Sequence, residues 1–166
     1  MAILKSMFSA CVIGLSLASV AWAQSTSISL GTSAFDSSLP VEMSADALSV
    51  DQSSGKAIFD GNVLVVQGDV RMSAGKVEII YKTDGNAGNG IEQLQATGGV
   101  TFVTATDAAE AAEAVYTIDS GTVEMSGNVL LTQGQASISG DKLIIDLTAG
   151  TGRMEGRVRT VFGGNN

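Results

Sequence analysis

The sequence predicts an all-β fold built from repeated two-stranded units. Three observations support this: apolar residues alternate with polar ones, two short motifs recur along the chain, and glycine is frequent (20 residues) while proline occurs once. Alternation at a period of two is typical of a half-buried strand, and glycine supplies the turns and bulges between strands. The length of 166 residues allows one medium-sized domain.

Composition excludes several classes of function. The chain has no histidine and one cysteine, Cys11, so it can form neither a histidine-based catalytic triad nor an internal disulfide or cysteine-rich zinc site. It has 9 basic and 17 acidic residues and a net charge of −8, which makes it a poor nucleic-acid binder because neutralising phosphates requires clustered Lys and Arg. We therefore expect no enzyme, no metal or other cofactor, and no nucleic-acid partner.

The first 23 residues have the features of a signal peptide. Lys5 gives a short positive region, and Met7–Val20 is an apolar run shorter than the ~20 residues of a membrane-spanning helix. Ala21 and Ala23 then place small residues at the two positions that signal peptidase reads. We expect cleavage after Ala23 and export to an oxidising compartment, since the remaining chain has no cysteine. An uncleaved anchor is the alternative.

Residues 24–40 are rich in serine and threonine, show no apolar pattern, and are expected to form a flexible leader. From residue 41 onward two motifs interleave. The first motif is Gly-X-Val, and it begins at Gly61, Gly98, Gly127 and Gly156. The second is small-acidic-X-aliphatic, and it begins at Ala45, Ala74 (where Gly75 replaces the acid), Ala112 and Gly140. Residues 61–68 align without gaps with residues 127–134, and such a period indicates a stack of supersecondary units.

Apolar residues at alternate positions predict the strands in chain order. The sets expected to face one way are Ala57 and Phe59, Val63 and Val65, Val77 with Ile79 and Tyr81, Val100 and Phe102, Val123 and Met125, Val129 and Leu131, and Leu143 with Ile145 and Leu147. Turn residues separate them at 51–55, 84–86 and 119–121. Residues 107–114 are rich in Ala and Glu and locally favour helix, but the repeat places a strand from about Ala112. We expect at most one helical turn before that strand.

A stack of this kind does not close on itself. The strands near 41–43 and 158–162 should therefore keep unpaired backbone groups at the two ends of the array. A basic cluster lies close to the second end, and it is either a solvated strand face or a contact for an anionic head group. Its members are Arg153, Arg157 and Arg159.

The apolar stripe also has two interpretations. It is either plain β core or the lining of a lipid groove. The groove is favoured because aromatic residues, which would fill a closed core, make up only 5% of the chain. Flexible methionines, which adapt to irregular partners, are spread along the repeats at Met43, Met72, Met125 and Met154.

Residues 41–162 resemble the LptA/OstA-like family of periplasmic lipopolysaccharide-transport proteins. The resemblance rests on Val41–Asp46, on the block Phe59–Gly68 and on its echo at 125–134, which are followed by Ala-Gly-Lys-Val and Gly-Asp-Lys-Leu respectively. It implies a twisted, partly open β-jelly roll whose two sheets form a V-shaped trough, followed by a short tail at 163–166. The segment near 83–110 departs from the family's pattern, so its loop contacts stay open.

The resemblance also implies a function and partners. It implies a carrier that shields the acyl chains of lipid A in an apolar groove between the inner and outer membranes. It implies head-to-tail stacking with copies of itself, with an LptC-like inner-membrane partner and with an LptD-like outer-membrane partner through edge strands. The alternatives are an exported structural β-solenoid whose stripe is all core, and an LptC-like component that keeps its anchor. The residues expected to bind lipid are Val41, Met43, Phe59, Val63, Val65, Met72, Val77, Ile79, Val100, Phe102, Met125, Val129, Leu131 and Leu143.

Overall fold

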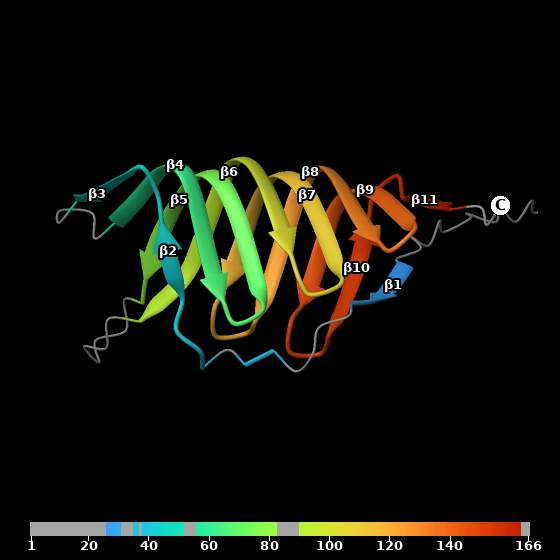
Figure 1. Ribbon diagram of the computed structural model, residues 1–166, viewed down its shortest axis with the longest axis horizontal. Helices are drawn as coiled ribbons and strands as arrows, with labels where there is room; N and C mark the ends of the chain where they lie inside the picture. Colours follow the sequence, from blue (N-terminus) through green and yellow to red (C-terminus); the bar gives the residue numbers. More distant parts are fainter. Residues whose placement is uncertain (1–25, 31–34, 37, 52–55, 83–89, 164–166) are drawn as a thin grey trace, which may run out of the picture.

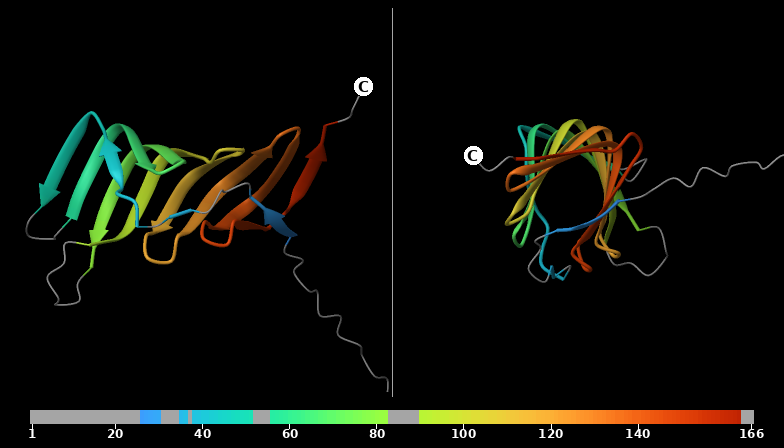
Figure 2. Two further views of the ribbon diagram at one scale, coloured as in Figure 1. Left: turned by 60° about the horizontal axis from the view of Figure 1, so that its bottom comes forward. Right: turned by 90° about the vertical axis from the view of Figure 1, so that its right-hand side faces the viewer.

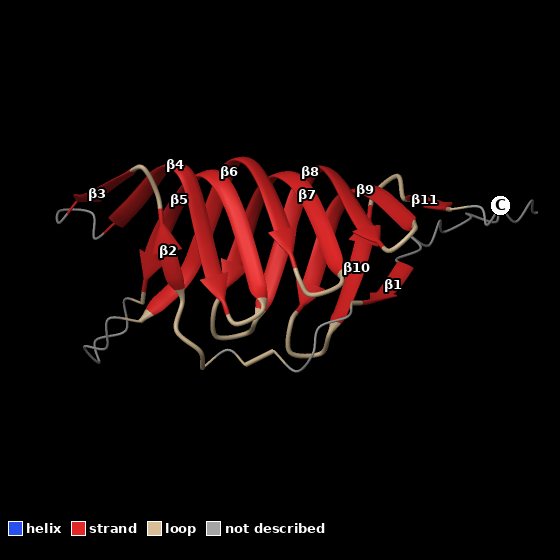
Figure 3. Cartoon of the chain, in the orientation of Figure 1, coloured by secondary structure: helices blue, strands red, loops and turns tan. Residues whose placement is uncertain are grey.

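A computed structural model of the chain describes residues 26–30, 35–36, 38–51, 56–82 and 90–163. The expected signal peptide and the last three residues of the expected tail lie outside these ranges. All regular secondary structure in the described residues is β-strand (Figure 3). No helix in this part of the chain is long and apolar enough to cross a membrane.

Eleven strands form one antiparallel sheet (Figure 1). The sheet order is β1-β10-β9-β8-β7-β6-β5-β4-β2, with β3 also paired to β4 and β11 also paired to β9. The strands are β1 (Thr26–Ser29), β2 (Glu42–Ser44), β3 (Ala47–Asp51), β4 (Lys56–Gln67), β5 (Val70–Tyr81), β6 (Ile91–Val103), β7 (Asp107–Thr117), β8 (Thr122–Gln133), β9 (Ala136–Asp146), β10 (Thr151–Glu155) and β11 (Arg159–Phe162).

The long strands bend along one line, which we call the crease. In β4 the crease is formed by Gly61 and Asn62, whose φ angles are 80° and 47°. These two residues face the single residue Gly75 of β5, because the register shifts between Asp60 and Val63. Such a two-against-one bulge bends the strand that carries the extra residue. The same pair of positive φ angles recurs in β6 (Gly98, Gly99), in β8 (Gly127, Asn128) and after β10 (Gly156, Arg157).

The two sequence motifs meet at the crease. The Asp46 N–H donates to the Gly61 carbonyl at 2.9 Å, and Asn62 Nδ2 donates to Asp46 Oδ2 at 2.7 Å. A Cβ added at Gly127 would lie 2.7 Å from the Cβ of Ala112, and φ there is 85°. Glycine is therefore required by both the backbone angle and the close approach of the second motif.

The crease divides the sheet into two half-sheets that face each other. Seen along the long axis, the two sides join at the crease and stand open opposite it (Figure 2). We call this open side, between the two rows of hairpin turns, the mouth. Half-sheet A consists of 47–51, 56–60, 76–81, 91–97, 113–117, 122–126, 142–146 and 151–155, extended by β1. Half-sheet B consists of 42–44, 63–67, 70–74, 100–103, 107–111, 129–133, 136–140 and 159–162.

Three local expectations differ from the structure. Thr26–Ser29 form β1 on β10 rather than part of a flexible leader, because Ile28 is buried against the core. Asp107–Thr117 are strand throughout, without a helical turn, because β7 pairs with β6 on one side and β8 on the other. Tyr81 is 37% exposed rather than inward, because the register shifts between Ile80 and Tyr81.

The ends of the sheet lie where the sequence places them. At one end β2 and β3 are the outer strands, and at the other end β1 and β11 are. β2 contains Met43 and β11 contains Phe162, which agrees with edges near 41–43 and 158–162. β1 shares the second end with β11 although it begins the described chain.

Candidate functional site

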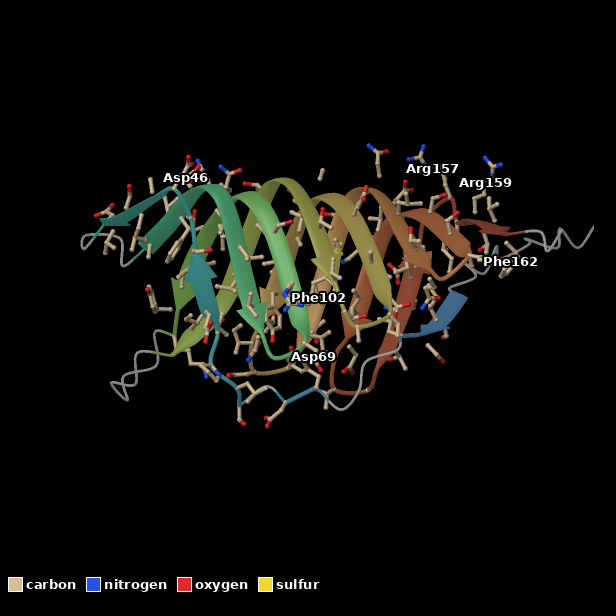
Figure 4. The ribbon with its side chains drawn as sticks, in the orientation of Figure 1. Asp46, Asp69, Phe102, Arg157, Arg159 and Phe162 are labelled. Atoms are coloured by element: carbon tan, nitrogen blue, oxygen red, sulfur yellow. The ribbon has the colours of Figure 1, made fainter. Side chains whose placement is uncertain are left out.

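Rows of apolar side chains line the interior between the two half-sheets. Residues that face each other across neighbouring strands point to the same side of a sheet, so each register row continues from strand to strand. A row on half-sheet B consists of Met43, Val65, Met72, Phe102, Ala109, Leu131 and Ile138. A row on half-sheet A consists of Phe59, Val77, Ala96, Ala114, Met125, Leu143 and Met154. Figure 4 places Phe102 midway along the molecule.

All fourteen predicted lipid-binding residues lie in or against this one core. Three of them, Val41, Met43 and Phe59, are partly buried and pack against the core. The others are buried: Val63, Val65, Met72, Val77, Ile79, Val100, Phe102, Met125, Val129, Leu131 and Leu143. The structure therefore brings the predicted residues together, and their contact with a lipid stays a prediction.

The interior includes buried residues that the predicted set omitted. Among them are Leu94, Tyr116, Val123, Ile145, Leu147 and Met154. The alternation already places Val123, Ile145 and Leu147 inward. In β6 the inward side chains pass from Ala96 to Val100 across the crease, a step of four residues that keeps Leu94 on the inward face, as the step from Met125 to Val129 in β8 keeps Val123.

Two glutamines at the mouth occupy equivalent places in the repeat. Gln67 Nε2 donates to the Leu39 carbonyl at 2.9 Å, and Gln133 Nε2 donates to the Ser29 carbonyl at 2.9 Å. Both glutamines are also fixed within the sheet. The Tyr116 hydroxyl donates to Gln67 Oε1 at 2.6 Å, and Gln133 Nε2 also donates to Asp107 Oδ1 at 2.9 Å.

Neither glutamine belongs to the set of residues predicted from the sequence. The signal was present, because the gapless alignment of 61–68 with 127–134 ends in Gln-Gly in both copies. Burial raises the pKa of Tyr116 to about 12. The network that holds Gln67 is therefore neutral at physiological pH.

An N-terminal strap lies along the mouth. We use this name for the described residues 26–30, 35–36 and 38–41, which are seen in blue and cyan along the lower side of Figure 1. Ile28 and Leu30 are each 6% exposed, and Phe35 and Val41 pack against the core. The Leu30 N–H donates to the Gly150 carbonyl at 2.9 Å, which ties the strap to a turn of half-sheet A.

Leu30 connects the two half-sheets. Its side chain lines a narrow space together with Phe102 and Leu131 of half-sheet B and Ile145 of half-sheet A. This space leaves no room for a water molecule. The strap therefore fills the mouth at this point with an apolar side chain.

The basic cluster faces outward, and two of its guanidinium groups are paired. Arg157 Nη2 lies 2.6 Å from Asp141 Oδ1, and Arg153 Nε lies 2.8 Å from Glu155 Oε1. The hydrogen bonds from Arg157 lower the pKa of Asp141, and the same contact raises the pKa of Arg157. Arg157 and Arg159 lie on the outer surface in Figure 4. These pairs favour the solvated strand face over a head-group contact.

Comparison with known proteins gives one consistent result. Residues 42–151 match the family described as LptA/(LptD N-terminal domain) LPS transport protein. The chain is 28% identical over 151 residues to an uncharacterised protein of Rhizobium meliloti, covering 86% of this chain and 81% of that protein. It is 29% identical over 114 residues to the lipopolysaccharide export system protein LptA of Escherichia coli, covering 65% of this chain and 60% of that protein.

A solved structure has the same fold. It is the crystal structure of LptH, the LptA-homologous periplasmic component of the lipopolysaccharide transport device of Pseudomonas aeruginosa. The TM-score is 0.67 at 16% sequence identity, over 78% of this chain and 99% of that chain. This likeness agrees with the twisted, partly open β-jelly roll that the sequence predicts.

Proposed function

Because the chain belongs to the family of LptA and the LptD N-terminal domain, it is a periplasmic lipopolysaccharide transport protein and not an enzyme, and from this premise we propose how it carries its cargo. Its apolar interior shields the acyl chains of lipid A from water on the way from the inner to the outer membrane. The sugar and phosphate groups stay outside the roll.

The observation that carries this proposal is the continuity of the apolar rows. The row through Val65, Met72 and Phe102 crosses half-sheet B from β2 to β9, and a similar row crosses half-sheet A from β4 to β10. The rows run across the strands, so they follow the long axis of the roll. An apolar track of this shape suits the long axis of a fatty acyl chain.

Burial of the acyl chain supplies sufficient free energy without any chemical step. Each buried methylene contributes about 0.8 kcal/mol, so a chain of about a dozen carbons contributes on the order of 10 kcal/mol as an upper bound. Direction would come from an energised partner, because binding alone favours neither end of the track.

We further propose that copies stack head to tail, and that the same edges meet an LptC-like partner on one side and an LptD-like partner on the other. The two ends of the sheet differ, with β2 and β3 at one end and β1 and β11 at the other. Leu48 and Val50 are exposed at the first end, and Val161 and Phe162 at the second. Contact between unlike ends propagates and extends the track from one domain to the next.

Site-specific photo-crosslinking tests the carrier function. A photoreactive residue at Val65 or Phe102 should capture lipopolysaccharide, because both side chains are buried and face inward. The same residue at Leu64 or Thr101 should not, because neighbours in a strand point to opposite faces. Leu64 is 38% exposed on the outer surface.

The crosslinking result also separates the alternatives. Capture of lipopolysaccharide at Val65 and Phe102 alone supports the groove. Folded protein that captures nothing at any position would identify the roll as a structural β-solenoid with a closed core. Equal capture at all four positions would contradict the assigned faces.

A further inference from the structure

We infer that the N-terminal strap is an internal competitor of the acyl chains, which a lipid displaces in order to enter the interior. This inference rests on the proposed carrier function. It concerns the mouth, which is the open side between the half-sheets. A lipid that enters through the mouth can place its acyl chains inside while its bulky head group stays outside.

The strap takes apolar places in the interior. Leu30 is 6% exposed and lies among Phe102, Leu131 and Ile145, two of which are predicted lipid-binding residues. Ile28 is equally buried, and Phe35 packs against the same core. An acyl chain that contacts Phe102 and Leu131 from the mouth would need the volume that Leu30 occupies.

The strap is held by few and replaceable bonds. Two glutamines clasp its backbone at Ser29 and Leu39, one ladder of four residue pairs joins β1 to β10, and the Leu30 N–H donates to the Gly150 carbonyl. Each clasp is a side-chain amide bound to a carbonyl, a bond that water can replace at small net cost. In contrast, the strands of the roll are joined by ladders of up to ten residue pairs. The strap can thus leave while the long ladders of the roll stay intact.

Competition changes the apparent affinity in a defined way. When the binding-competent form is a fraction of the population, the apparent Kd is the intrinsic Kd divided by that fraction. Weakening the strap should therefore tighten lipid binding, and fixing it in place should weaken lipid binding.

A disulfide provides the lock. Ser27 faces Arg153 across the β1–β10 ladder, and both side chains are exposed. Leu30 and Gly150 are a hydrogen-bonded pair of this ladder, three residues along from Ser27 and Arg153. Hydrogen-bonded and non-hydrogen-bonded pairs alternate along an antiparallel ladder, so Ser27 and Arg153 form a non-hydrogen-bonded pair. Facing residues of this kind have Cα atoms about 4.5 Å apart, which a disulfide can span. The expected mature chain has no other cysteine.

The matched control lies within the roll. Leu64 of β4 faces Ser73 of β5, and both side chains are exposed. A disulfide there joins two strands of the roll that stay paired whether or not the strap leaves. The exported chain with Ser27→Cys and Arg153→Cys is compared with the chain with Leu64→Cys and Ser73→Cys, each oxidised and reduced. The measurement is anisotropy of fluorescent lipid A.

We expect oxidation of the Ser27–Arg153 pair to weaken lipid A binding at least tenfold, with recovery on reduction. Oxidation of the control pair should leave binding unchanged. Equal binding by the locked and reduced forms would overturn the competition while leaving the carrier function standing. Binding by none of the forms would overturn the carrier function and the competition with it.

A second variant avoids dependence on the disulfide. Leu30→Ala should bind lipid A several-fold more tightly, whereas Leu64→Ala, which truncates an outward leucine, should bind as the wild type does. In the wild type, lipid A should speed hydrogen exchange of the Leu30 amide, since its bond to Gly150 opens. Slower exchange of this amide on lipid binding would show that the strap closes over the lipid, and would overturn the inference.

Discussion

Tyr116 has a buried hydroxyl group in an otherwise aliphatic interior, where it donates to Gln67 Oε1 at 2.6 Å. Burial raises its pKa from 10.0 to about 12, because the phenolate would lose its hydration. The raised pKa stabilises the fold below pH 10, and this contribution is lost as the pH rises through 12.

The titration of Tyr116 is a direct test of its surroundings. In a Tyr81→Phe variant the phenolate absorbance should rise only near pH 12 while the protein stays folded by circular dichroism. Tyr116→Phe leaves the buried Gln67 Oε1 without this donor and should lower the free energy of unfolding by about 1–3 kcal/mol. Urea unfolding measures this change, with Tyr81→Phe as the control. A phenolate that forms near pH 10 in folded protein would contradict the buried hydrogen bond.

Gly127 shows how a single residue sets the crease. Its φ of 85° disfavours any side chain, and a Cβ would meet that of Ala112 at 2.7 Å. Gly99 has a similar φ of 82°, but a Cβ there would meet nothing within 4 Å. We expect Gly127→Ala and Gly99→Ala each to cost about 1–3 kcal/mol of stability from backbone strain, and Gly127→Ala to cost more.

A double-mutant cycle isolates the extra cost at Gly127. Combining Gly127→Ala with Ala112→Gly removes the close contact and should recover part of the loss. The free energies of unfolding of the four proteins give the coupling. Equal losses for Gly127→Ala and Gly99→Ala would show that the contact with Ala112 does not constrain the crease.

At the scale of elements, β11 offers its outer edge for pairing. The Gly163 N–H donates to the Gln135 carbonyl at 2.9 Å, and the alternation of an antiparallel ladder then points the N–H of Thr160 away from β9. Thr160→Pro removes this outward donor and leaves the bonds to β9 in place. Thr160→Val keeps the donor and is the matched control.

We expect the wild type and Thr160→Val to gain mass with concentration in light scattering, and Thr160→Pro to remain monomeric. Backbone pairing carries most of the affinity in this kind of contact, which is why the side-chain change should matter little. A wild type that stays monomeric at high concentration would contradict self-stacking and leave lipid binding standing.

The strands of the roll could be predicted because their signal is local. Alternation in Val63–Val65 or Leu143–Ile145 needs only a short window, and the Gly-X-Val motif marks the crease within β4, β6 and β8. β1 could not be predicted in this way. Its four residues pair with β10, more than a hundred positions along the chain, and they carry too short a pattern to show alternation. In β7, pairing on both sides overrides the helix preference of its Ala and Glu residues.

The apolar rows of the candidate site could be predicted from the same local alternation as the strands. Alternation places Val65 and Phe102 on one face, and a register row then brings them together. The clasps by Gln67 and Gln133 were not predicted, because a bond from a side chain to a distant carbonyl leaves no periodic pattern. Their shared place in the repeat is the single trace that they leave in the sequence.

At the scale of the whole molecule, we predict that the exported protein begins at Gln24. Small residues at Ala21 and Ala23 fit the site that signal peptidase reads. Mass spectrometry of the protein from its native envelope should find a soluble chain that lacks residues 1–23. A membrane-bound mass that retains them would favour an LptC-like anchored component.

The position of β1 dictates the order in which the chain folds. Every other ladder joins strands that are adjacent in the chain or separated by one strand, so the hairpins can form in turn as the chain emerges N-terminus first. Thr26 pairs with Met154, so the first strand to emerge can pair only after β2 to β10 have emerged. We therefore expect each newly exported molecule to pass through a stage in which the strands of its trough are formed while β1 has not yet covered them, and at this stage its interior faces the periplasm before it has received any cargo.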